Sequence, residues 1–304
     1  MDSLHIIRLD RINRDDRRFS VSYPMESPLL LESIAKAGVI QPVLLIIDGP
    51  TFTVVTGCRR IEAAMKLGSI SVPAIVTDRL SGKDALLCAI HDNLSRGFNA
   101  VEKALALSKM VRMGFPLEEV KETMTLLGLK THEKILRTFI ALADSKESLK
   151  SFVVSRNLSV TNIEGLMRFD NGEMEQLLSL FTQIHTTEGY LREILKMAAL
   201  MRLKDGRIDF QGLSGSENAE DLRTKLKHRT FPMLSSLQEQ LETLRRRCAL
   251  PPNMDIKVDP SFEKEYIDID IRVKNINDVE QALEKLGKVM EDGSLRSMLE
   301  LTKG

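Results

Sequence analysis

Apolar and polar positions in the first hundred residues alternate between strand-like runs and helical periods. Three short runs rich in β-branched residues are typical of strands: Val43–Ile47, Phe52–Val55 and Val72–Thr77. The turn Asp48-Gly49-Pro50 joins the first two into a hairpin. Helical periods precede Gly38 and Gly68, and a third helix, capped by Ser81 and Asp84, runs to about Arg96. The pattern predicts an α/β domain.

The period is helical throughout from Ala100 to about Lys204. Five residues mark the expected helix starts: Pro116, Thr131, Ser145, Ser159 and Thr187. Gly, Ser and Asp are frequent in 205–217, which is typical of a linker.

The tail returns to a mixed pattern. Asp221–Cys248 is expected to be one helix, and Asp278–Met290 an amphipathic second one. Between them, Met254–Val258 and Ile267–Val273 alternate apolar and charged positions, as half-buried strands do. A two-stranded sheet with isoleucine-rich faces is unstable alone, so we expect it to pair with a second copy of the chain.

These patterns predict an α+β multidomain protein. Residues 1–98 form an α/β domain, 99–210 an all-α domain, and 218–304 a small αββα domain. At 304 residues the chain is long enough for each to have its own core.

Composition restricts the function classes. With 43 basic and 43 acidic residues the formal net charge is zero, so binding to DNA requires a local basic patch. The three cysteines are too far apart in sequence for a C-x-x-C zinc site, and a reducing cytoplasm suits them. No apolar stretch approaches the length of a membrane span, so we expect no membrane contact.

Two motifs carry candidate chemistry. Thr56-Gly57-Cys58-Arg59-Arg60 follows a strand and opens a helix, where free N–H groups, a glycine and two arginines suit a phosphate. Asp92-Asn93-x-x-Arg96 closes the next helix, and a carboxylate beside an amide oxygen suits Mg²⁺. Each also has a plain structural interpretation, the first as solvated arginines and the second as an Asp92–Arg96 pair one helical turn apart.

Together the motifs resemble the ParB family. Gly38-Val39-Ile40-Gln41-Pro42, then Gly57-x-Arg59-Arg60, then Asp92-Asn93-Leu94-x-Arg96 followed by Asn99 and Glu102, match its three N-terminal boxes in order. The resemblance implies a ParB/sulfiredoxin-like fold that binds CTP and Mg²⁺ and hydrolyses CTP slowly. Gln41 is then near the base, and Gly57, Cys58, Arg59 and Arg60 are at the phosphates. Asp92 and Asn93 are the metal and catalytic pair, with Arg96 reaching the phosphates.

Two residues depart from the family pattern. Cys58 and Asp92 stand where glutamates are usual, and Asp92 has a shorter reach, which affects hydrolysis more than binding. Cys58 also resembles the catalytic cysteine of sulfiredoxin, and a helix N-terminus favours the thiolate. A sulfiredoxin-like or small-molecule kinase activity using ATP or ADP is therefore the alternative function. A structural adaptor with an inactive nucleotide site is a further one.

The resemblance assigns the middle of the chain to a helix-turn-helix that binds double-stranded DNA. Pro116–Leu127 and Thr131–Ala143 are the expected helices, and 130–156 contains six Lys or Arg against three Asp or Glu. Candidate DNA contacts are Lys130, His132, Lys134, Arg137, Thr161 and Asn162.

By the same resemblance the tail is a homodimerisation domain, and the whole chain is a nucleoid- or plasmid-associated DNA clamp in the cytoplasm, for DNA segregation or related transcription regulation. The basic N-terminal arm by which many relatives stimulate a ParA-type ATPase is missing, because Met1 lies almost at the first strand. The sequence therefore does not predict whether the protein has a ParA-type partner.

Overall fold

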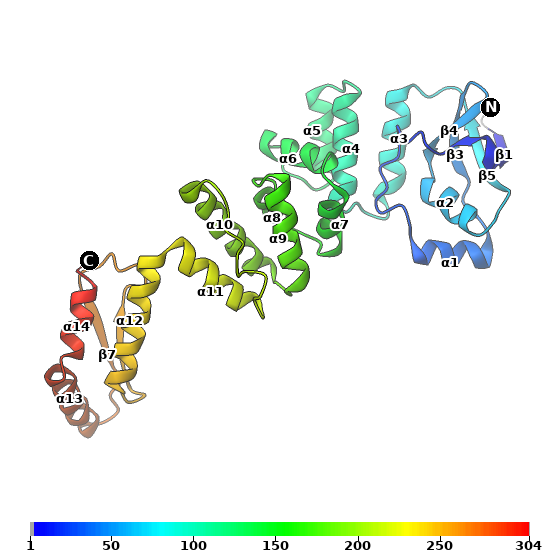
Figure 1. The fold of residues 1–304 in the computed structure, drawn as a ribbon. Helices are drawn as coiled ribbons and strands as arrows, with labels where there is room; N and C mark the ends of the chain where they lie inside the picture. The colour runs from blue at the N-terminus through cyan, green and yellow to red at the C-terminus, as the bar shows by residue number, and fades with distance from the viewer. Residues whose placement is uncertain (1–2, 304) are drawn as a thin grey trace. The chain divides into compact units, whose positions relative to one another are not determined.

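A computed structural model of the protein describes residues 3–303 (Figure 1). Its contacts divide the chain into two compact units, Met1–Gln183 and Ile184–Gly304. The fold is mixed α+β, as expected. The boundary between the units lies inside the stretch 99–210, because helix α10 (Glu188–Asp205) packs against α11 (Ala219–Thr230).

A five-stranded mixed sheet is the centre of the first hundred residues. Its order is β1-β5-β3-β4-β2. The strands are β1 (Ser3–Arg8), β2 (Ile12–Asn13), β3 (Val43–Asp48), β4 (Thr51–Thr56) and β5 (Ser71–Thr77). The expected hairpin is β3–β4, and β5 returns parallel to β3 after a helix.

Two helices, α2 (Cys58–Lys66) and α3 (Gly82–Leu94), pack against the sheet, and α1 (Pro28–Ala37) packs against α2. Ile61 and Ala64 of α2 pack into the core with Phe52 and Val54 of β4. Val55 faces the other way along the strand and is also buried, and α3 packs against β4. The capping box of Ser81 and Asp84 begins α3 as predicted.

The rest of the first unit is helical. It contains α4 (Ala100–Arg112), α5 (Leu117–Leu126), α6 (Glu133–Ala143), α7 (Glu147–Ser155), α8 (Val160–Leu166) and α9 (Asn171–Gln183). The starts predicted at Thr131 and Ser145 are wrong, since His132 and Lys146 are the residues before α6 and α7. Ser145 instead closes α6, because its hydroxyl donates to the Leu142 carbonyl.

The second unit ends in a small α/β assembly. After α11 come α12 (Pro232–Cys248), β6 (Met254–Val258), β7 (Ile267–Ile271), α13 (Ile276–Glu291) and α14 (Ser294–Leu301). The single helix predicted over Asp221–Cys248 is wrong. It breaks at Pro232, which lacks an N–H and disfavours helical geometry at Phe231. Helix α14 was not anticipated.

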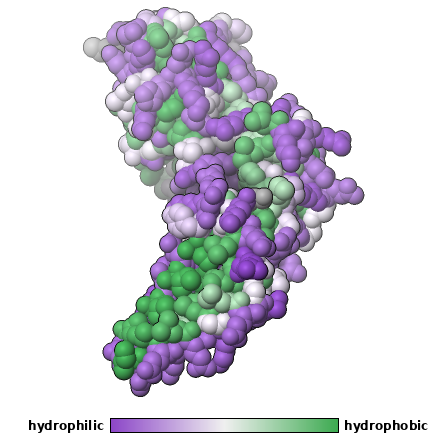
Figure 2. Space-filling model, turned by 90° about the vertical axis from the view of Figure 1, so that its left-hand side faces the viewer, coloured by the Kyte–Doolittle hydropathy of each residue, from purple (hydrophilic) through white to green (hydrophobic). Residues whose placement is uncertain are grey.

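One face of this assembly is apolar and uncovered. Met254, Ile256 and Val258 of β6 are buried, whereas Ile269 and Ile271 of β7 are 37% and 36% exposed. Larger exposed fractions belong to apolar side chains that follow: Val273, Ile276, Leu283 and Met290. Figure 2 shows apolar atoms gathered into a continuous area at the lower end of the view.

Candidate nucleotide-binding site

The turn from β4 into α2 is built for close approach by a ligand. Gly57 has φ +93°, in the left-handed region, and a Cβ there would lie 2.6 Å from Cγ1 of Val43. Only glycine fits without displacing the strand. The N–H groups in the first turn of any α-helix have no partner within the helix. In α2, which begins at Cys58, no side chain caps them either. Such a helix start favours an anion.

Arg60 lies at the bottom of this turn. Its Nη1 donates to the carbonyl oxygens of Gln41 and Pro42, both at 2.8 Å. Its Nη2 lies 3.5 Å from Oδ2 of Asp92, and the side chain is only 14% exposed. Burial lowers the pKa of Arg60, and Asp92 opposes that shift. A cation that is this poorly solvated and only weakly paired favours an anionic ligand.

Arg59 and Arg96 meet at one carboxylate, that of Glu102 on α4. Nη2 of Arg59 lies 3.1 Å from its Oε1, and Arg96 binds both of its oxygens, at 2.7 and 3.0 Å. The Asp92–Arg96 pair, which was the plain structural alternative for the third motif, does not form. Arg96 turns to Glu102 instead, and Asp92 faces Arg60.

The seven residues predicted to bind nucleotide and the predicted catalytic residue Asp92 line one cleft of about 330 Å³. The seven are Gln41, Gly57, Cys58, Arg59, Arg60, Asn93 and Arg96. Sequence reasoning missed four further lining residues: Ser22, Ser27, Leu30 and Ser95. Two of them carried a signal, because Ser27 was recognisable as the cap of α1 and Ser95 lies inside the third motif. Ser22 and Leu30 gave none.

The charge of the cleft suits a polyphosphate. Three arginines line it against one carboxylate, Asp92. The side-chain amide of Asn93 is fixed by two hydrogen bonds. Its Nδ2 donates to the Ala89 carbonyl, and its Oδ1 accepts from Nε of Arg96. Within residues 3–303, no group of three or more His, Cys, Asp or Glu side chains is arranged to hold a metal ion. A cation in the cleft therefore needs oxygens from its ligand as well as from Asp92.

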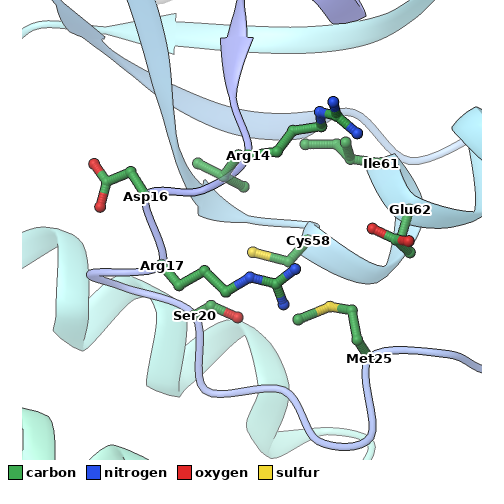
Figure 3. Close-up of a pocket in the computed structure, with 9 residues that line it drawn as sticks. Arg14, Asp16, Arg17, Ser20, Met25, Cys58, Ile61 and Glu62 are labelled. Atoms are coloured by element: carbon green, nitrogen blue, oxygen red, sulfur yellow. The ribbon is translucent and has the colours of Figure 1, made fainter.

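The environment of the Cys58 thiol disfavours the reactive thiolate form. Figure 3 shows it beside Arg17, Ser20 and Met25, in a pocket of about 20 Å³, which has room for roughly one water molecule. Burial raises the pKa of Cys58, and the nearby charge of Arg17 only partly offsets this. The helix start does not overcome desolvation, so the thiol is mainly protonated at neutral pH. This weakens the sulfiredoxin-like alternative.

The candidate DNA contacts are distributed around α6. Lys130 and His132 lie in the turn before it, while Lys134 and Arg137 lie on it, and all four are exposed. Lys134 pairs with Glu164 of α8 and Arg137 with Glu133, one turn earlier on its own helix. Thr161 is exposed, but Asn162 is fully buried. The structure therefore removes Asn162 from the set, because its side chain has no access to a ligand.

A family model described as the ParB N-terminal domain matches residues 2–94. The N-terminal domain belongs to the ParB family. Spo0J, a chromosome-partitioning protein of Thermus thermophilus, is 38% identical over 92 residues, 30% of this chain and 34% of that protein. A nucleoid occlusion protein of Shouchella clausii is 21% identical over 246 residues, 80% of each chain.

The segment that matches the Thermus protein spans about a third of that protein's length. The match that extends over most of this chain has a lower sequence identity, 21%. Among solved structures, a C-terminally truncated ParB of Caulobacter crescentus complexed with CTP-γ-S is 20% identical. It covers 64% of this chain and 92% of that one, with a TM-score of 0.28. The same protein complexed to the centromeric parS site gives a TM-score of 0.36 at 18% identity. No helix within residues 3–303 has the length and apolar character of a membrane-spanning segment.

Proposed function

We propose that this protein is a CTP-dependent DNA clamp of the ParB type. It acts in chromosome or plasmid segregation, or regulates transcription by the same switch. One observation carries the proposal: three motifs spread over residues 38–96 converge on one cleft with three arginines and one carboxylate. A cleft of about 330 Å³ lies within the usual range for small-molecule sites, roughly 300–1,000 Å³.

Different residues of the cleft contact the phosphates and the base of the nucleotide. The N–H groups after Gly57 and the guanidinium groups of Arg59, Arg60 and Arg96 bind the phosphates. Gln41 lies beside the base. Cytosine specificity is taken from the family resemblance, because the cleft geometry alone does not distinguish bases.

Mg²⁺ fits the carboxylate of Asp92 and the amide oxygen of Asn93, provided phosphate and water fill its remaining positions. Asn93 must then release Nε of Arg96, its present donor. Bound there, the ion neutralises phosphate charge. Asp92, 36% exposed at the edge of the cleft, has access to solvent and can accept a proton from an attacking water.

Calorimetry with CTP, ATP, GTP and UTP, each with Mg²⁺ and with or without DNA, tests the proposal. CTP is expected to bind at least tenfold more tightly than the other three, a difference of about 1.4 kcal/mol. A purine preference with turnover faster than about one per second favours the small-molecule enzyme instead. Absence of binding by all four leaves the structural adaptor.

Replacing Asp92 by alanine is expected to stop CTP hydrolysis while binding falls less than about tenfold, since Asn93 and the phosphates still hold the metal. Phosphate release and equilibrium binding are measured in parallel. The control is Asp78→Ala, an exposed carboxylate of the same domain that does not line the cleft. Hydrolysis that persists in Asp92→Ala refutes the catalytic assignment.

DNA binding through α6 is expected to depend steeply on salt. If Lys130, Lys134 and Arg137 each contact a phosphate, changing all three to alanine lowers the log–log salt slope by about 2.7, or about 0.9 per contact. Fluorescence anisotropy over a salt series measures it. The matched control replaces three exposed cations of the ParB domain: Arg8, Lys36 and Arg79. Equal slopes for the two triple variants would exclude α6 as the DNA-binding element.

A further inference from the structure

Glu102 is the most deeply buried carboxylate near the cleft, with 1% of its side chain exposed. It is the third residue of α4 and forms a capping box with Asn99. The Glu102 N–H donates to Oδ1 of Asn99 at 2.9 Å, and the Asn99 N–H donates to Oε2 of Glu102 at 3.1 Å. A cap residue needs no more than this. Its other contacts therefore require a separate explanation.

Those contacts join three separate segments. Oε1 accepts from Nη2 of Arg96 at 2.7 Å, from Nη2 of Arg59 at 3.1 Å and from the Tyr23 N–H at 3.1 Å. Oε2 accepts from Nη1 of Arg96 at 3.0 Å. Glu102 does not line the cleft itself, whereas both arginines do. It therefore lies behind the two cations, on the side away from the ligand space.

The electrostatics require this carboxylate. Burial lowers the pKa of Arg59, Glu102 opposes this shift, and the neighbouring charge of Arg96 lowers the pKa further. Without Glu102 the two guanidinium groups repel each other at a partly desolvated position. Conversely, a ligand that drew both arginines away would leave a buried, uncompensated carboxylate, which is strongly unfavourable.

The contacts also orient the arginines. Nε and Nη2 of Arg59 are engaged by the carbonyls of Pro24 and Tyr23 and by Glu102. Within the described residues, no acceptor is recorded for Nη1 of Arg59, and the residue lines the cleft. Arg96 is fixed by a two-pronged bond, which sets the plane of its guanidinium.

We propose that Glu102 is a positioning residue for the polyphosphate site: its buried carboxylate holds Arg59 and Arg96 side by side at the cleft, without itself touching the ligand. This inference rests on the proposed nucleotide binding and adds a residue that acts only through the two arginines. Because Glu102 also caps α4, the same carboxylate fixes the start of the helical region to the phosphate side of the cleft.

The test is the affinity of the full-length protein for CTP with Mg²⁺, measured by calorimetry. Glu102→Gln keeps the shape and one acceptor but removes the charge, and is expected to weaken binding about tenfold. Glu62→Gln is the matched control, since it removes a carboxylate from α2, three residues after Arg59, that makes no recorded contact with it. Its affinity is expected to stay within about twofold of the wild type.

A double-mutant cycle separates positioning from a merely structural role. Arg96→Ala alone is expected to weaken binding about tenfold, but less than about threefold when Glu102 is already glutamine, because the two changes remove one arrangement. Additive losses, or unchanged or tighter binding by Glu102→Gln, overturn the inference. Wild-type protein that binds no nucleotide overturns the proposed function together with it.

Arg96→Lys tests the same idea without touching Glu102, in case Glu102→Gln does not fold. Lysine keeps the charge but loses the two-pronged bond, so binding is expected to fall about tenfold despite the conserved charge. Wild-type affinity in Arg96→Lys shows that the orientation is irrelevant and sinks the inference.

Discussion

Arg60→Ala is expected to weaken CTP binding by about 100-fold. A hydrogen bond to a charged group contributes about 1.5–3 kcal/mol, and the loss of one or two bonds from a guanidinium to phosphate gives about 2.8 kcal/mol. The side chain also ties the Gln41–Pro42 segment to α2, so its removal frees the connection before β3 in which Gln41 lies. Both effects act on the bound nucleotide, and calorimetry measures their sum.

Two variants make this prediction specific. Arg8→Ala removes the same charge from an exposed ion pair with Asp10 and is expected to leave the affinity unchanged. Arg60→Lys keeps the charge without the planar fork and should fall between wild type and Arg60→Ala. Equal affinities for wild type and Arg60→Ala would remove Arg60 from the site and contradict the convergence of the three motifs.

Ile269→Asp is expected to convert a dimer into monomers, raising the dissociation constant about 1,000-fold or more. β7 pairs with β6 on one side and has no second strand neighbour within residues 3–303. We expect the exposed apolar side chains of β7 and α13 to be covered by those of a second copy across a two-fold axis. Each lost isoleucine contributes about 1.5–3 kcal/mol and occurs twice, and each new aspartate adds a desolvation cost.

Sedimentation equilibrium of the full chain at micromolar concentration measures the effect, and circular dichroism checks that the variant is folded. The control is Asp268→Asn, which alters the neighbouring residue on the opposite face of β7. The control should remain dimeric. A wild-type chain that sediments as a monomer contradicts the dimer expected from the sequence.

The sequence was most informative where chemistry and local structure coincide. Gly57, Arg60 and Asp92 were identified from motifs at element boundaries, and the structure places all three on one cleft. The hairpin β3–β4 followed from two β-rich runs and one turn, because its contacts are local. Helix caps were reliable where the side chain closes a box, as at Ser81.

The errors have physical causes that a single sequence conceals. Helical spacing allowed an Asp92–Arg96 pair as the alternative interpretation, but Glu102 presents two oxygens to Arg96 from the next helix. Asn162 has a polar side chain of the kind that contacts DNA, but the fold buries it in the core. At Pro232 a steric rule divides into two helices a stretch that was predicted as one.

The contacts of Glu102 and Arg60 also differ in how far apart in sequence their partners are. Arg60 reaches Gln41 across 19 positions, whereas Asp92 is 32 from Arg60, Glu102 is 43 from Arg59, and Tyr23 is 79 from Glu102. The entropy lost in closing a loop grows with its length, and local contacts form earliest during folding. We therefore expect the contacts of Arg60 with the Gln41–Pro42 segment to form early in folding, and its contact with Asp92 to form after a longer loop has closed.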